Sequence, residues 1–139
     1  MVLGDYAGRW TLVTGGGDGV GRAIALGLGQ SGMKVLVCDV RKDAAEQVAD
    51  EIQQEGGQAQ AVQADVSDRT SLISTANHLA ENGVVPSLLV ANAGVGAGVG
   101  IIDASPRTIE WVFSVNVLGI AWTAQAFVPH MLKQDGPKH

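Results

Sequence analysis

The 139-residue chain has little cysteine and few basic side chains, and each shortage excludes a class of protein. Its single cysteine, Cys38, cannot form an internal disulfide, so we expect a reducing compartment, with the cytoplasm as the default. One cysteine and three histidines without ligand spacing predict no metal site. Nine basic residues against fourteen acidic ones give a net charge of −5, which offers no basic surface to a nucleic acid.

The chain also lacks a long uninterrupted apolar run. The longest nearly apolar stretch, residues 115–128, is short for a bilayer span and contains polar side chains such as Asn116. The amino-terminal segment carries Asp5 and has no basic start followed by a long apolar stretch, so no targeting segment is expected. We therefore expect neither a membrane nor a nucleic acid as a partner.

Glycine, by contrast, is abundant. The chain has 19 glycines, about twice the usual share of roughly 7%. They gather around positions 15–21, 27–32 and 94–100, and so mark turns rather than a low-complexity tract. With 46% hydrophobic residues, the chain has room for one packed domain, residues 1–139, and no second domain.

The first glycine cluster has the pattern of a phosphate-binding turn. It follows a short apolar strand expected over residues 9–14 and precedes a helix expected over residues 20–31. Glycines allow a sharp turn and a close approach of the backbone to a pyrophosphate, while free N–H groups at the helix start face the negative charge. The cofactor-binding candidates in this turn are Gly15, Gly17, Asp18, Gly19 and Val20.

A second glycine pattern, G-x-G-x-x-G over residues 27–32, matches the dinucleotide expression literally. It lies at the end of a helical stretch, where phosphates would meet carbonyl groups rather than N–H groups. We interpret Gly27 and Gly29 as close-packing positions and Gly32 as the stop of the helix.

The rest of the chain alternates strands with helices. Strands are expected over residues 34–38, 58–64 and 88–91, and helices over 44–55, from 67 or 68 to 82, and from 105 to about 133. The strand over 88–91 is nearly all apolar, which predicts burial on both faces. The alternation predicts an α/β fold, a Rossmann-type doubly wound parallel sheet that is incomplete, with about four strands and flanking helices.

Asp39 directly follows the second strand, at the sheet edge where a carboxylate can accept hydrogen bonds from an adenosine ribose. It would repel a 2′-phosphate, as would Asp18, so NAD is favoured over NADP. Arg41 favours the opposite preference, because its side chain could turn onto a 2′-phosphate.

Two further strands end in polar residues that could line the same site. Asp65 and Val66 follow the third strand and could hold the adenine edge, or simply start a turn. Asn92, Ala93 and Gly94 end the fourth strand at the carboxyl edge of the sheet, where ligands bind in open α/β folds. With the glycine turn upstream, we interpret all five as cofactor-binding candidates.

In order along the chain, T-G-x-x-x-G-x-G at 14–21, Asp39, Asp65-Val66, N-A-G at 92–94 and S-V-N-V-x-G at 114–119 resemble the short-chain dehydrogenase/reductase family. The motifs span essentially the whole chain, with Ala91 standing where the family often has a further asparagine. The resemblance implies a Rossmann-type fold that binds NAD or NADP and moves a hydride between nicotinamide and an alcohol or carbonyl carbon.

The resemblance also implies a proton relay of an asparagine, a serine, and a tyrosine followed four residues later by a lysine. Asn116 matches the asparagine and is the one catalytic candidate; Tyr6, the only tyrosine, is followed at that spacing by Trp10. We therefore expect residues 1–139 to be the cofactor-binding part of a truncated oxidoreductase, inactive alone. The full-length enzyme would act on a small-molecule alcohol or carbonyl substrate.

The resemblance further implies a homo-oligomer, because the long last helix of relatives commonly lies at a subunit interface. Trp122, Ala126 and Phe127 could serve there or be plain core, and we favour core for apolar residues at helical spacing. The fourth strand would have a bare edge along residues 88–91, which invites association.

Two other functions stay open. The chain could be a non-catalytic dinucleotide-binding module or partner subunit that lacks the relay. It could also be a methyltransferase, since Gly15, Gly17, Gly19 and Asp39 could hold S-adenosylmethionine. That reading leaves Asn92 and Asn116 without a role, and ligand choice would distinguish it.

Overall fold

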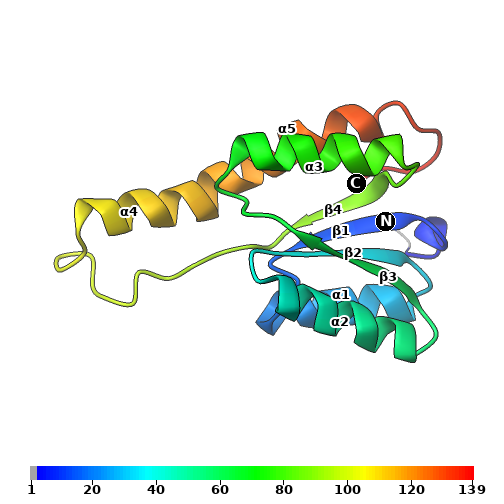
Figure 1. Cartoon of the computed structure of the whole chain (residues 1–139), viewed down its shortest axis with the longest axis horizontal. Helices are drawn as coiled ribbons and strands as arrows, with labels where there is room; N and C mark the ends of the chain where they lie inside the picture. The colour runs from blue at the N-terminus through cyan, green and yellow to red at the C-terminus, as the bar shows by residue number, and fades with distance from the viewer. Residues whose placement is uncertain (1–2) are drawn as a thin grey trace.

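The computed structural model describes residues 3–139 as a parallel sheet between two layers of helices (Figure 1). The four strands are β1 (Trp10–Thr14), β2 (Lys34–Asp39), β3 (Gln58–Gln63) and β4 (Pro86–Ala91), in the order β3-β2-β1-β4. The helices are η1 (Leu3–Tyr6), α1 (Gly19–Gln30), α2 (Lys42–Gln54), α3 (Arg69–Glu81), α4 (Pro106–Phe113), the π-helical turn η2 (Ser114–Leu118) and α5 (Gly119–Met131). This is the expected Rossmann-type doubly wound arrangement.

The two faces of the sheet are covered by different helices. Helices α1 and α2 lie on one face and α3 and α5 on the other (Figure 1). Adjacent strand residues point to opposite faces, so Val13 joins Ile52 of α2 in one core while Leu12 joins Phe127 of α5 in the other. The strands β2 and β3 are added on one side of β1 and β4 on the other, so the order of the strands reverses between β1 and β4. Open α/β sheets bind ligands at such a topological switch point.

The expected strands and helices all form, with ends that differ by at most two residues. Asp68 caps α3 by accepting a hydrogen bond from the Ser71 N–H, and Gly32 stops α1 with a φ of +84°. Gly29 packs as predicted, because a Cβ there would lie 2.8 Å from Ile52 Cγ2. The interpretation of Gly27 was wrong: a Cβ at that position meets nothing within 4 Å. Gly27 is exposed.

Two expectations for β4 are corrected. Leu88 is buried, but Leu89 and Val90 are half-buried and Ala91 is exposed, because β4 is the edge strand of the described sheet. The edge is covered at Ser87 and Leu89, because the His139 N–H donates to the Ser87 carbonyl and the Leu89 N–H donates to the His139 carbonyl, both at 2.9 Å. The unpaired backbone groups of an edge strand readily accept such a segment.

Helices α4 and α5 form one continuous run through η2, and α4 projects beyond the sheet (Figure 1). By length and composition alone, Pro106–Met131 could cross a membrane, and it is the one such helix within residues 3–139. The face of α5 that lies against the sheet belongs to the hydrophobic core. Ala126 and Phe127 are buried there, as predicted. Trp122 is half-buried, with the Arg69 guanidinium 5.6 Å from its ring.

Cys38 is a core residue on β2, and we expect it to resist thiol reagents. Burial, and then the nearby charge of Asp39, raise the pKa of its thiol to about 12. Iodoacetamide at pH 8 should leave the native chain unmodified and label it fully in urea. Because the folded-state pKa exceeds the ordinary value of 9.0, this group's contribution to stability is complete below pH 9 and falls as the pH rises towards 12. Rapid labelling of the native chain would contradict the buried position.

Candidate functional site

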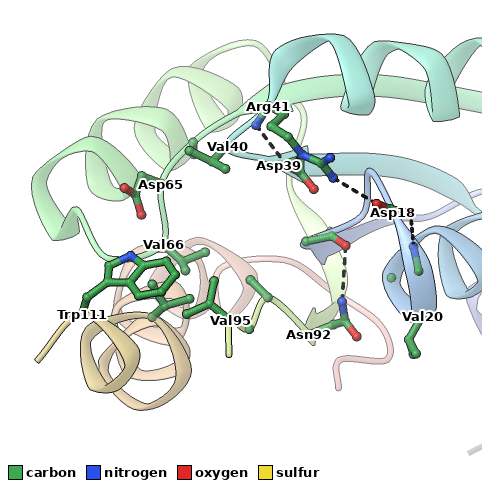
Figure 2. Close-up of a pocket in the computed structure, with 17 residues that line it drawn as sticks. Asp18, Val20, Asp39, Val40, Arg41, Asp65, Val66, Asn92, Val95 and Trp111 are labelled. Atoms are coloured by element: carbon green, nitrogen blue, oxygen red, sulfur yellow. Dashed lines mark hydrogen bonds and ion pairs between the residues drawn. The ribbon is translucent and has the colours of Figure 1, made fainter. Parts of the chain in front are cut away.

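The carboxyl ends of the strands surround a cavity of about 820 Å³ (Figure 2). Its size is typical of small-molecule and cofactor sites. Of the residues predicted to bind a cofactor or to act in catalysis, Gly17 and Asn116 are outside the cavity lining. The other ten line it together: Gly15, Asp18, Gly19, Val20, Asp39, Asp65, Val66, Asn92, Ala93 and Gly94.

The glycine turn between β1 and α1 depends on glycine at two kinds of position. Gly15 has a φ of +63°, in the left-handed region that other residues avoid. Gly21 is required by packing instead, because a Cβ there would overlap the Gly15 carbonyl oxygen. The Gly16 N–H donates to the Cys38 carbonyl at 2.9 Å, which fastens the turn to the end of β2.

The amino terminus of α1 presents unpaired donors to the cavity. Asp18 is the N-cap residue and accepts a hydrogen bond from the Gly19 N–H at 2.7 Å. The N–H groups of Val20 and Gly21, in the first turn, donate to no acceptor within residues 3–139. Such free donors, together with the positive end of the helix dipole, fit a phosphate or pyrophosphate group.

Asp39 is held rigidly at the end of β2. One carboxylate oxygen accepts the Gly17 N–H and the other accepts the Arg41 N–H, each at 3.0 Å. The side chain is buried yet still lines the cavity. Gly17 therefore does not line the cavity, but its backbone N–H orients the Asp39 carboxylate. A carboxylate so fixed beside an anion-binding turn can accept hydrogen bonds from vicinal hydroxyls, as in a ribose.

The Arg41 side chain lies between two carboxylates. Its Nε is 3.5 Å from Asp39 Oδ1, and a terminal nitrogen is 3.5 Å from Asp18 Oδ2 (Figure 2). Its one positive charge thus faces two negative ones at this rim of the cavity. The guanidinium is about half exposed, so solvent weakens both ion pairs.

Asn92 fastens β4 to the glycine turn. Its side-chain Nδ2 donates to the carbonyl oxygens of Thr14 and Gly15, at 3.1 and 3.3 Å. The backbone N–H groups of Asn92 and Ala93 both donate to Thr14 Oγ1 at 3.1 Å. The Asn92 amide is therefore committed to shaping the turn. Thr14, buried at the end of β1, belongs to the motif at 14–21 but was not predicted as a site residue, and its hydroxyl helps to hold the turn.

Asn116 has a comparable role on the opposite wall. It sits in the π-helical turn η2, where its Oδ1 accepts the Val95 N–H at 2.8 Å and its Nδ2 donates to the Val95 carbonyl at 2.9 Å. Both ends of the amide are thus paired with the backbone of one residue. Asn116 holds Val95 in the cavity wall and its own side chain does not line the cavity.

The end of the cavity beyond Asp39 is formed by Val40, Asp65, Val66 and Trp111 (Figure 2). The side chain of Asp65 turns towards its own backbone, since its Oδ1 accepts from both the N–H and the hydroxyl of Ser67. Trp111, on α4, was missed by sequence reasoning. The available signal was its i, i+4 spacing from Val115, which lines the same cavity.

The fold and site together define a Rossmann-type α/β domain with a ligand cavity at its topological switch point. The profile of the short chain dehydrogenase family matches residues 9–138. The chain belongs to this family.

Among its relatives is estradiol 17-beta-dehydrogenase 11 of Mus musculus, which is 35% identical over 94% of this chain and 44% of the relative. The 7alpha-hydroxysteroid dehydrogenase of Escherichia coli (strain K12) is 34% identical over 93% of this chain and 50% of its own length. A crystal structure of a short chain dehydrogenase/reductase from Burkholderia phymatum in complex with NAD superposes with a TM-score of 0.89, at 35% identity, over 97% of this chain and 48% of that one. The chain thus spans about half the length of these relatives.

Proposed function

We propose that residues 1–139 supply the NAD(H)-binding site of an oxidoreductase that moves a hydride between nicotinamide and an alcohol or carbonyl carbon. The observation that carries the proposal is the Asp39 carboxylate, fixed by two backbone N–H groups beside the free donors of α1. The dinucleotide-bound relative from Burkholderia phymatum, which has the same fold, supports it.

Each part of the cavity fits one part of a dinucleotide. The Val20 and Gly21 N–H groups would bind the pyrophosphate, and Asp39 would accept hydrogen bonds from the adenosine ribose. Asp65 and Val66 would hold the adenine edge. Asn92, through the glycine turn, and Asn116, through Val95, act as positioning residues. When bound, the nicotinamide would supply the hydride chemistry.

The charges at the rim favour NAD over NADP. A 2′-phosphate on the adenosine ribose would approach Asp39, whose carboxylate is buried and cannot turn away because both of its oxygens are paired. Asp18 adds a second negative charge nearby, and Arg41 is shared between the two carboxylates. The net field at this corner therefore opposes a phosphate.

Titration calorimetry of the chain with NAD⁺, NADP⁺ and S-adenosylmethionine tests the proposal. We expect NAD⁺ to bind at least about tenfold more tightly than NADP⁺, which corresponds to about 1.4 kcal/mol of repulsion at the rim. S-adenosylmethionine should give no heat of binding. Binding of S-adenosylmethionine without NAD⁺ would favour a methyltransferase, and equal affinity for the two dinucleotides would refute the selectivity.

We also propose that the protein acts as a cytoplasmic homo-oligomer on a small-molecule alcohol or carbonyl compound. The support for self-association is an exposed apolar stripe on the outer face of the last helical run, formed by Phe113, Val117 and Ile120. Their i, i+4, i+7 spacing places them on one side of the helix. Exposed apolar patches of this kind commonly mark interaction surfaces.

A further inference from the structure

The cavity end beyond Asp39 has apolar walls that the pyrophosphate and the ribose leave unused. Val40, which follows β2, is 58% exposed, and Trp111 of α4 is 47% exposed. Val66, after β3, and Val115, one helical turn beyond Trp111, line the same end. Figure 2 shows Trp111, Val66 and Asp65 at the same end of the cavity, which all three residues line. A large aromatic surface is thus left open to solvent where a ligand would cover it.

The position of Trp111 is fixed by the local fold. Ser105 caps α4 by accepting the Thr108 N–H at 3.1 Å, and Pro106 starts the helix. Val115 is buried in the sheet core, which sets the rotation of the continuous helix. Because residues four apart lie on one helix face, Trp111 is turned towards the same cavity as Val115.

The other two tryptophans lie outside the cavity and beside cations. The Lys34 ammonium is 5.8 Å from the ring of Trp10, and the Arg69 guanidinium is 5.6 Å from the ring of Trp122. Trp111 makes no such contact within residues 3–139, and its indole N–H donates no hydrogen bond there. The tryptophan of the cavity is therefore the one whose face is free for a ligand.

Apolar walls with the Asp65 carboxylate beside them suit a purine that carries an exocyclic amine. Asp65 Oδ1 is occupied by Ser67, whereas its Oδ2 accepts no hydrogen bond within the described part of the chain. An amine of the base can donate to that oxygen while the ring stacks on the indole. Base–aromatic stacking is a strong contribution in nucleotide-binding proteins in general.

We propose that Trp111 is the stacking platform for the adenine base, and so a specificity-determining residue of the cofactor site. This inference rests on the proposed dinucleotide function and adds a residue to it. Because the platform comes from α4, whereas the pyrophosphate and ribose contacts come from β1, α1 and β2, the adenine would join two separate elements of the fold.

The test combines tryptophan fluorescence with calorimetry on the 139-residue chain. ADP-ribose should quench the emission with the dissociation constant that calorimetry gives, whereas nicotinamide mononucleotide, which lacks adenine, should not. Trp111→Leu should remove the quenching and weaken ADP-ribose binding about tenfold. Trp111→Phe, which keeps an aromatic face, should restore affinity to within about threefold of wild type. The matched control is Trp122→Phe, which should keep both the quenching and the affinity.

The outcomes separate the two proposals. Absence of calorimetric binding of both NAD⁺ and ADP-ribose to the wild-type chain would overturn the dinucleotide function and, with it, the role of Trp111. Normal binding with unchanged affinity in Trp111→Leu, or quenching that persists in that variant, would overturn the stacking role alone. Far-UV circular dichroism checks that the variants fold, and the Phe variant keeps the test decisive if the Leu variant does not.

Discussion

Replacing Gly21 with alanine should abolish dinucleotide binding. The new Cβ would overlap the Gly15 carbonyl oxygen and lie 2.5 Å from Asn92 Nδ2. Both atoms belong to the hydrogen bond that shapes the glycine turn, so the methyl group must displace the turn itself. We expect the affinity for NAD⁺ to fall more than about a hundredfold and the free energy of unfolding to fall by about 1–3 kcal/mol, as for other overpacked sites.

Gly27→Ala is the matched control for this substitution. It lies on the same helix and makes the same chemical change, but its Cβ would meet nothing within 4 Å. Alanine should therefore leave NAD⁺ binding unchanged and stabilise the chain by up to about 1 kcal/mol through helix propensity. Calorimetry and urea denaturation of both variants provide the measurement. Full binding by the Gly21 variant would mean that the turn is not the pyrophosphate site.

Replacing Asp39 with alanine should reverse the preference between the two dinucleotides. The variant loses the acceptor for ribose hydroxyls and the charge that opposes a 2′-phosphate, and it frees Arg41 from one of its two carboxylates. Hydrogen bonds to a charged group contribute about 1.5–3 kcal/mol each, so NAD⁺ affinity should fall at least about tenfold. NADP⁺ affinity should stay level or rise.

The control for Asp39 is Asp50→Asn, which removes the same charge from an exposed position on α2. It should leave both affinities unchanged, so any change of selectivity is local to the cavity rather than a result of net charge. Calorimetric titration of each variant with NAD⁺ and NADP⁺ gives the ratio. If Asp39→Ala kept the wild-type ratio, the carboxylate would have no part in ribose recognition.

Local chemistry made most of the fold predictable. The cap at Asp68, the stop at Gly32 and the Pro106 start each depend on a few neighbouring residues, and all are present in the structure. The parallel direction of the strands followed from their alternation with helices. Ligand-facing positions at the strand ends were predictable for the same reason, since parallel strands bring their carboxyl ends to one edge.

Contacts between distant segments were not predictable. Gly27 and Gly29 look equivalent in the sequence, and only the packing of α1 on α2 distinguishes them. Asn116 was predicted as the asparagine of a proton relay, and its sequence neighbourhood did not indicate that its side chain pairs with Val95, 21 residues away. The burial of β4 depended on its being the sheet edge, and the cavity position of Trp111 on how α4 continues into the core. The spacing of Trp111 from Val115 was a signal for its position, but residue spacing does not indicate the other contacts.

The hydrogen bonds that Asn92 and Ala93 donate to Thr14 and Gly15 bear on the entropy of ligand capture. A loop that is disordered before binding must lose its conformational freedom when the ligand arrives, and affinity falls accordingly. Here the turn is already held by β4 through Asn92 Nδ2 and Thr14 Oγ1, over 77 to 79 residues of sequence. Folding has thus already ordered the backbone that meets the phosphates. Capture of a dinucleotide by this chain should be close to rigid-body docking at the turn.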